Sequence, residues 1–183
     1  MGGLMIKIIY AIAGPARSGK NYLASLMKEA IGDKKLVQCL ALADPLRIDL
    51  NKEFPGIAGV DDTAYEAMKN SINGTALRIR MLERSEYFKK LHGPDVFINA
   101  LLSRILPETD IVIITDLGND YEAQQLNNWC WGQDRSVWLY TIQLERPGYS
   151  YTNEVYRTPI TNPHWNVKFD DIPKIAKILT NWV

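Results

Sequence analysis

The sequence predicts an α/β fold with a mainly parallel sheet. Two observations lead to this prediction: short apolar runs alternate along the chain with segments of helical periodicity, and the runs at 8–13 and 111–114 consist of apolar residues. Uninterrupted apolar runs are typical of parallel strands that helices cover. The length of 183 residues is typical of one domain, so we expect a single domain over 1–183.

The first part of the chain predicts two strands, each followed by a helix. An apolar run makes 7–13 a buried strand, and apolar residues on one face make 21–31 a helix that ends at Gly32. The run 36–42 predicts a second buried strand. Asp44-Pro45 is a typical start of the next helix.

The middle of the chain is predicted to be mainly helical. Glycines interrupt a polar stretch at 56–74, for which no element is predicted. The segment 75–91 predicts a helix. A second, amphipathic helix is predicted at 95–106, with Asp95 as its N-cap.

The last part of the chain returns to alternating strands and helices. The strongest strand is predicted at 111–116, where four β-branched apolar residues precede a threonine and an aspartate. A helix is predicted at 122–129 and a strand at 137–144. A short strand at 166–169 and a helix at 172–182 complete the predicted order.

The turn after the first predicted strand indicates a phosphate-binding loop. Its sequence Gly14-Pro15-Ala16-Arg17-Ser18-Gly19-Lys20 has the spacing G-x-x-x-x-G-K. The glycines let backbone amides approach a phosphate, Lys20 supplies a positive charge, and the helix dipole favours an anion. The fold prediction is therefore a P-loop NTPase-type three-layer sandwich. The predicted phosphate-binding residues are Gly14, Ala16, Arg17, Ser18, Gly19, Lys20 and Asn21.

Three acidic or amide residues are candidates for a magnesium site. Asn21 stands where Ser or Thr usually contacts Mg²⁺, and it either holds a hydrated ion or caps the helix. Asp116 follows an apolar strand and suits a magnesium hydration shell, with a turn residue as the alternative. Asp44 orients an acceptor, binds magnesium or caps a helix.

Phosphoryl transfer requires cations near the transferring group, and the chain has several candidate arginines. Arg17 and Arg47 adjoin the ends of predicted strands. For the arginines at 78–84, a solvent-exposed helix face is the alternative. The aromatic segment 146–165 is either a lid over a base or a loop packed on the sheet. The further candidates are Arg78, Arg80, Arg84 and Arg146.

Composition excludes several classes of function. Lys+Arg and Asp+Glu are both 21, so the chain lacks the basic excess of a duplex-binding protein, and no nucleic-acid partner is expected. The two cysteines and two histidines show no zinc spacing. The apolar run 8–13 is too short for a signal peptide, and no run is long enough to span a membrane. We therefore expect a cytoplasmic protein without a membrane partner.

In their order, these motifs resemble the bacteriophage deoxynucleoside monophosphate kinases, a family of P-loop small-molecule kinases. The loop 14–21 is similar to that family's G-x-x-R-S-G-K-D, and 43–47 is similar to its A-D-P-L-K segment. The resemblance spans about 6–182, with Gly118 in place of an arginine and Tyr22 in place of a small hydroxyl residue. Further similar segments are Leu91–Asp95, Val112–Asp116 with Glu122-Ala123, and Glu145–Gly148 with Glu154.

The resemblance implies an enzyme that transfers the γ-phosphoryl group of ATP to a deoxynucleoside monophosphate, with Mg²⁺ as cofactor. It implies an acceptor-binding helical region at about 45–106 and a lid at about 146–165. Related kinases are often dimers, so a homodimer is compatible with it, and a phage origin would place the protein in host cytoplasm. The implied catalytic residues are Lys20, Arg17 and Asp116; Asn21 and Asp116 hold the metal through water, and Arg146 joins the ATP-binding set. The implied acceptor-binding residues are Asp44, Arg47, Tyr87, Lys90, Gly93, Phe97, Glu122 and Glu154.

Two other functions stay open on the sequence. One is a P-loop kinase for a non-nucleotide phosphorylated acceptor. The other is a catalytically degenerate nucleotide-binding module, which Asn21 and Gly118 would mark. Thermal stabilisation by dGMP or dTMP favours the deoxynucleoside monophosphate kinase, and stabilisation by ATP alone favours the non-nucleotide acceptor. Nucleotide binding without turnover for any monophosphate favours the degenerate module.

Overall fold

The computed structural model describes residues 8–55, 57, 74–133, 136–152 and 157–181. The chain divides into two compact units. The sheet unit comprises Met1–Ala41 and Arg104–Val183, and the helical unit comprises Leu42–Ser103. The single domain over 1–183 stays a prediction.

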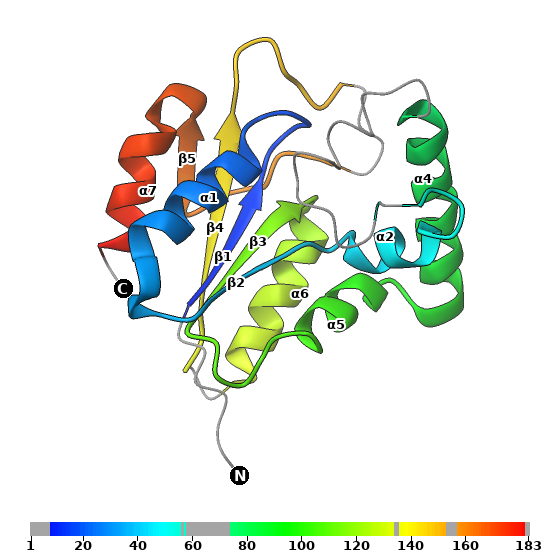
Figure 1. The fold of residues 1–183 in the computed structure, drawn as a ribbon, viewed down its shortest axis with the longest axis horizontal. Helices are drawn as coiled ribbons and strands as arrows, with labels where there is room; N and C mark the ends of the chain where they lie inside the picture. Colours follow the sequence, from blue (N-terminus) through cyan, green and yellow to red (C-terminus); the bar gives the residue numbers. More distant parts are fainter. Residues whose placement is uncertain (1–7, 56, 58–73, 134–135, 153–156, 182–183) are drawn as a thin grey trace. The chain divides into compact units, whose positions relative to one another are not determined.

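The described part of the sheet unit contains a five-stranded sheet in the order β2-β3-β1-β4-β5, and every pair of neighbours is parallel (Figure 1). Non-consecutive neighbours require crossover connections, as the predicted alternation of strands and helices implies. The strands are β1 (Ile8–Ala13), β2 (Val37–Leu40), β3 (Ile111–Leu117), β4 (Trp138–Glu145) and β5 (Trp165–Lys168).

Helices cover both faces of this sheet. On one face, Tyr10 and Ile12 of β1 belong to an apolar core with residues of the first and last helices, α1 and α7. Because side chains alternate along a strand, Ile9 and Ala11 point to the opposite face, where α6 packs on β4. The predicted three-layer α/β fold is therefore confirmed. The helices of this unit are α1 (Lys20–Ile31), α6 (Asp120–Trp131) and α7 (Ile172–Thr180).

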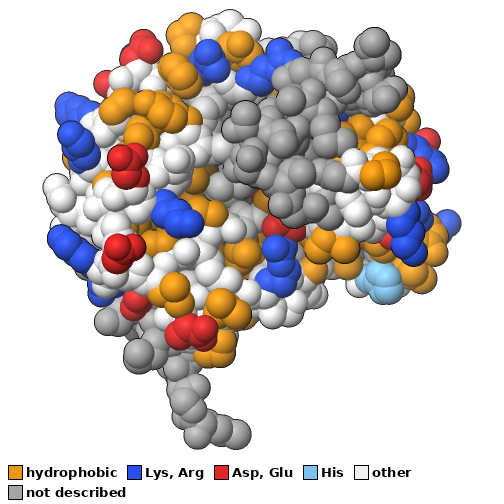
Figure 2. Space-filling view, in the orientation of Figure 1, with side chains coloured by type: hydrophobic (Ala, Val, Ile, Leu, Met, Phe, Trp, Pro, Cys, Tyr) orange, Lys and Arg blue, Asp and Glu red, His pale blue; other side chains and the backbone are white. Residues whose placement is uncertain are grey.

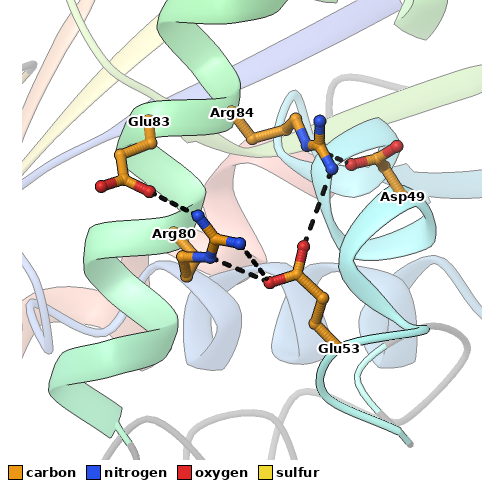
Figure 3. A network of polar contacts seen from close by, with 5 residues as sticks. All are labelled: Asp49, Glu53, Arg80, Glu83 and Arg84. Carbon is orange, nitrogen blue, oxygen red and sulfur yellow. Dashed lines mark hydrogen bonds and ion pairs between the residues drawn. The ribbon is translucent and has the colours of Figure 1, made fainter.

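The helical unit combines a small apolar cluster with surface ion pairs. Leu50, Ile57 and Leu77 form the buried cluster. Beside it, Arg80 and Arg84 of α4 form ion pairs with carboxylates, among them Glu53 (Figure 3). The described helices are α2 (Asp44–Leu50), α4 (Gly74–His92) and α5 (Val96–Leu102).

Most predicted elements lie within two residues of the observed bounds, but α5 ends at Leu102 and not at Leu106. The reason is a side chain distant in sequence: the Gln38 Oε1 accepts the Leu106 backbone N–H at 2.9 Å, and its Nε2 donates to the Arg104 carbonyl at 3.3 Å. Asp95 occupies the predicted N-cap position without a side-chain capping bond. Most of the unassigned stretch 56–74 lies outside the described residues.

The surface of the described residues carries no large area of one charge in the view of Figure 2, where basic and acidic side chains are interspersed. Of the helices that the structure describes, none is both long and apolar enough to cross a membrane. Cys39 is exposed and Cys130 is buried, and neither of them forms a disulfide bond. Burial raises the pKa of the Cys130 thiol to about 11.

Candidate phosphate-binding site

The loop between β1 and α1 has a backbone that requires its two glycines. Gly14 has φ 153° and Gly19 has φ 99°, both in the region that side chains disfavour. A Cβ on Gly14 would lie 2.5 Å from the Ser18 Oγ and 3.1 Å from the Leu144 carbonyl oxygen. The loop is therefore packed too closely for any other residue at this position.

A third loop residue, Arg17, also has a left-handed backbone, with φ 62°. For a residue other than glycine this conformation costs about 1–2 kcal/mol. The Arg17 carbonyl accepts a hydrogen bond of 2.7 Å from the Arg146 Nη1, at the end of β4. A residue at the start of the predicted lid thus contacts the centre of the loop.

Lys20 is the first residue of α1, and its ammonium group bends back into the loop. The Nζ donates to the Gly14 carbonyl at 2.8 Å and to the Pro15 carbonyl at 2.7 Å, and the side chain is buried. Gly19 is the N-cap of this helix and has no side chain to cap it. Asn21 is therefore the second residue of the helix, and the alternative in which it caps the helix is wrong.

Ser18 lies beneath the surface of the loop. It is completely buried, and its N–H donates to the Pro15 carbonyl at 3.2 Å. Within the described residues its Oγ has no hydrogen-bond partner. The sequence predicts a phosphate-binding role for Ser18, and that role stays a prediction.

Phe169, which directly follows β5, packs against the loop and was not predicted as a site residue. A Cβ on Gly19 would lie 2.9 Å from the Phe169 ring, so the ring contacts the glycine closely. The Arg146 guanidinium lies 4.2 Å from the centroid of the same ring and 4.7 Å from that of Tyr149. Arg146 therefore contacts two aromatic rings, each a favourable cation–π partner.

A cleft of about 1020 Å³ lies beside the loop within the sheet unit. Its wall includes Pro15, Arg146, Tyr149 and Phe169. The buried side chain of Gln143 organises its floor, because the Nε2 donates to the Tyr151 hydroxyl at 2.7 Å and the Oε1 accepts the Ile160 N–H at 3.0 Å. The cleft has the size of a small-molecule binding site.

The aromatic segment has more than one role. Tyr149 is exposed and stacks on Arg146, whereas Tyr151 is tied to Gln143. Trp165 begins β5 and packs against the apolar core. Tyr156 and the predicted acceptor-binding Glu154 lie outside the described residues.

Asp116 lies near the carboxyl end of β3, next to the strand that leads into the loop. Its neighbour Leu117 pairs with Ala13, which directly precedes the loop. Asp116 and Asn21 both offer oxygen donors, which Mg²⁺ prefers. Among the described residues there is no cluster of three His, Cys, Asp or Glu side chains that could hold a metal by itself. The metal-binding roles of Asp116 and Asn21 stay predictions.

Glu122 has a structural role at the start of α6. Its Oε2 accepts the Gly118 N–H at 2.7 Å, while the Asn119 Oδ1 accepts the Glu122 N–H at 3.0 Å. Such reciprocal bonds satisfy amides at a helix start. The Gly118 carbonyl also accepts the Thr158 N–H at 2.9 Å. The acceptor-binding role of Glu122 stays a prediction.

In the helical unit, two predicted acceptor-binding residues contact each other. The Arg47 Nη1 lies 3.4 Å from the Asp44 Oδ1, one helical turn away in α2. Asp44 begins the helix as its first residue, after Ala43 as N-cap. This contact leaves the acceptor role of both residues a prediction.

The remaining acceptor-binding candidates of the helical unit differ in exposure. Tyr87 and Lys90 are exposed on α4, and Gly93 has φ 91°. Phe97 is buried in α5, with its ring 6.3 Å from that of Phe88 in an edge-on arrangement. A buried ring that packs on a second ring serves the core of this unit, so base stacking on Phe97 stays a prediction.

Arg80 and Arg84 are engaged by carboxylates (Figure 3). Arg84 contacts Asp49 at 2.6 Å, and Arg80 contacts Glu53 at 2.9 Å and Glu83 at 2.8 Å. Hydrogen bonds to Glu83 and then Glu53 raise the pKa of Arg80. The structure thus favours the alternative in which these arginines belong to a solvated helix surface.

The sheet order, the glycine-bounded loop and the helix that begins at its lysine define a P-loop NTPase-type α/β protein. Two solved structures have a similar fold. One is titled APE1195, with 14% identity over 98% of this chain and 96% of that chain, and a TM-score of 0.52. The other is a cysteine-to-alanine mutant of the APS kinase CysC of Mycobacterium tuberculosis, with 16% identity over 97% and 96% and a TM-score of 0.53.

No family model and no curated protein sequence matches the chain. At such identities the two structural similarities show the fold alone. They confirm the predicted fold class, because one of the two similar structures is that of a P-loop kinase. The resemblance to the phage deoxynucleoside monophosphate kinases stays a prediction.

Proposed function

We propose that the protein is an ATP-dependent kinase that transfers the γ-phosphoryl group of ATP–Mg²⁺ to a deoxynucleoside monophosphate. The observation that carries this proposal is the loop 14–20, in which left-handed glycines and a buried lysine precede a helix. This arrangement directs amide hydrogens and a positive helix end toward an anion.

The donor phosphates would bind at this loop. Lys20 is already positioned there by two backbone carbonyls, and its flexible stem lets the ammonium move to phosphate oxygens. The cleft beside the loop has room for the rest of a nucleotide. Arg17, in the middle of the loop, is the proposed cation near the transferring group.

Asp116 and Asn21 would hold Mg²⁺ through water molecules. An ion held there would supply positive charge next to the donor phosphates. Their carboxylate and amide oxygens are hard ligands, and magnesium sites that use substrate phosphates take few ligands from the protein.

The acceptor is the finer part of the proposal. It is supported by the resemblance of the segments 43–47, 91–95 and 145–148 to the family's acceptor and lid motifs. We propose Asp44, Arg47 and Lys90 as polar contacts of the acceptor, together with Tyr87, Gly93, Phe97, Glu122 and Glu154.

A second candidate is a kinase with a different phosphorylated acceptor. The structural similarity to an APS kinase favours it, because that kinase shares the fold over nearly its whole length. The two candidates use the same donor site. They differ only in the acceptor that supports turnover.

The experiment is an acceptor panel. Purified protein is mixed with ATP–Mg²⁺ and each deoxynucleoside monophosphate, each ribonucleoside monophosphate or APS, and ADP and the phosphorylated product are quantified. Turnover with one dNMP supports the proposal, and turnover with APS alone supports the second candidate. Binding of ATP without turnover for any acceptor indicates a nucleotide-binding module.

Replacement of Lys20 tests the donor site. We expect Lys20→Ala to lower kcat by roughly 100-fold or more, because a positioned cation on the transferring group is lost. The matched control is Lys177→Ala, which removes an exposed lysine on α7 of the same unit. Full turnover by the Lys20 variant would contradict the assignment.

A further inference from the structure

The contact between Arg146 and the phosphate loop connects two segments far apart in the sequence. The Arg146 Nη1 donates to the carbonyl of Arg17 at 2.7 Å, across 129 positions of the chain. Arg17 is, with Asn162, one of two described residues other than glycine with a positive φ. The Arg146 guanidinium therefore binds the carbonyl of a loop residue whose left-handed backbone is unfavourable for a side chain.

The guanidinium group also contacts two aromatic rings. It lies 4.2 Å from the Phe169 centroid and 4.7 Å from the Tyr149 centroid, and both contacts favour the position in which it reaches the loop. Phe169 in turn contacts Gly19. Arg146 and Phe169 thus contact the loop at two places, at its centre and at its end.

We propose that Arg146 is a positioning residue that holds Arg17 in its left-handed conformation and so keeps the phosphate loop in its binding shape. The inference deepens the proposed function and rests on it for its consequence in catalysis. It differs from a direct role of Arg146 on phosphate, because the guanidinium acts through a backbone carbonyl of the loop.

The decisive experiment is a double-mutant cycle between positions 146 and 17. Arg146→Ala removes the hydrogen bond and the stack, and Arg17→Gly lets the backbone adopt the left-handed conformation without support. If Arg146 acts by holding Arg17, its removal matters in the natural protein and matters little once glycine occupies position 17.

The first readout needs no ligand. We expect Arg146→Ala to raise hydrogen exchange of the Ser18 amide, which is bonded to the Pro15 carbonyl, by about tenfold or more. In the Arg17→Gly background the same change should be less than about threefold. Amides of β3 serve as an internal control for global unfolding.

The second readout is ATP–Mg²⁺ affinity by calorimetry. We expect Arg146→Ala to weaken binding about tenfold in the natural background and about twofold or less beside Gly at position 17. Equal losses in both backgrounds, or unchanged Ser18 exchange in Arg146→Ala, would overturn the proposal. Equal losses in affinity are what a direct phosphate contact predicts.

Controls separate this inference from other failures. Arg146→Lys keeps the charge but lacks the planar group that stacks on aromatic rings. Compared with Arg146→Ala, we therefore expect it to restore only part of the protection of the Ser18 amide. Lys177→Ala should leave both readouts unchanged. If the natural protein does not bind ATP–Mg²⁺, the proposed function fails, while the exchange cycle still decides the role of Arg146.

Discussion

The sheet unit and the helical unit are stabilised by different interactions. In the sheet unit, side chains of four strands and two helices form one apolar core, and the centres of β1 and β3 are completely buried. Among its described residues, the helical unit has a smaller buried cluster of Leu50, Ile57 and Leu77, and ion pairs join α4 to Asp49 and Glu53. Within the part of the chain that the structure describes, the sheet unit therefore shows one large apolar core, and the helical unit combines a smaller cluster with partly exposed ion pairs.

The largest expected effect tests the apolar core. Ile113→Ala, in the middle of β3, should lower the free energy of unfolding by about 3–5 kcal/mol, because the large core cannot collapse around the cavity. Leu77→Ala in the helical unit should cost about 2 kcal/mol, since its small cluster relaxes more readily. Urea denaturation measures both, and equal costs would contradict the comparison.

The next effect concerns the loop itself. Gly19→Ala places a methyl group 2.9 Å from Phe169 at φ 99°, so we expect a loss of about 2–3 kcal/mol and of ATP binding. Gly32→Ala is the matched control, because it also has a positive φ, 60°, but no atom within 4 Å of the added carbon. It should cost about 1 kcal/mol and leave ATP affinity unchanged.

The third effect is a dependence of the folding stability on pH, through the buried Tyr10. The Tyr10 hydroxyl donates to the Leu179 carbonyl at 2.9 Å, and burial, with Tyr140 nearby, raises the pKa of Tyr10 to about 12. A raised pKa means that the folded state prefers the protonated phenol. The protonated Tyr10 therefore contributes to the folding stability below a pH of about 10. This contribution is lost as the pH rises toward 12, which lowers the free energy of unfolding by about 1–2 kcal/mol.

Thermal melts between pH 9 and 12 measure this loss, with the phenylalanine variant as reference. Tyr10→Phe should lose about 1 kcal/mol at neutral pH and show a weaker fall of stability in that interval. An identical fall in both proteins would show that Tyr10 does not titrate within the core.

The smallest effect tests the ion pairs of the helical unit (Figure 3). Arg84→Gln removes the contact of 2.6 Å with Asp49, and both side chains are about one-third exposed. Partly exposed pairs contribute about 1 kcal/mol or less, and salt screens them. The difference in stability should therefore shrink between 0.1 M and about 1 M NaCl, and a difference independent of salt would argue against a role for exposed charge.

The elements that were predicted well are those with a local cause. The apolar run of β1, the glycines of the loop and the amphipathic pattern of α1 lie within 24 consecutive positions, and the structure has them in that order. Phe169 and Arg146 contact the loop from positions more than 120 residues away. No local pattern predicts such contacts.

The end of α5 and the role of Glu122 illustrate the same limit. The Gln38 side chain binds the Leu106 amide across 68 positions, so the helix ends earlier than its apolar pattern indicates. From the sequence, Glu122 is compatible with a ligand contact and with a capping role at a helix start. Its bond to the Gly118 N–H shows the capping role. The sequence does contain a signal for this capping role, because an Asn three residues before a Glu is a capping pattern.

The Lys20 ammonium donates to two carbonyl oxygens of its own loop, and under the proposed function a ligand has to replace them. Any incoming group has to offer oxygens that attract the ammonium more strongly than these neutral dipoles do. A singly charged carboxylate gains little from this exchange, whereas a polyphosphate brings several negative charges at once. If the loop binds phosphate as proposed, we therefore expect it to select its ligand first by charge density and only then by shape.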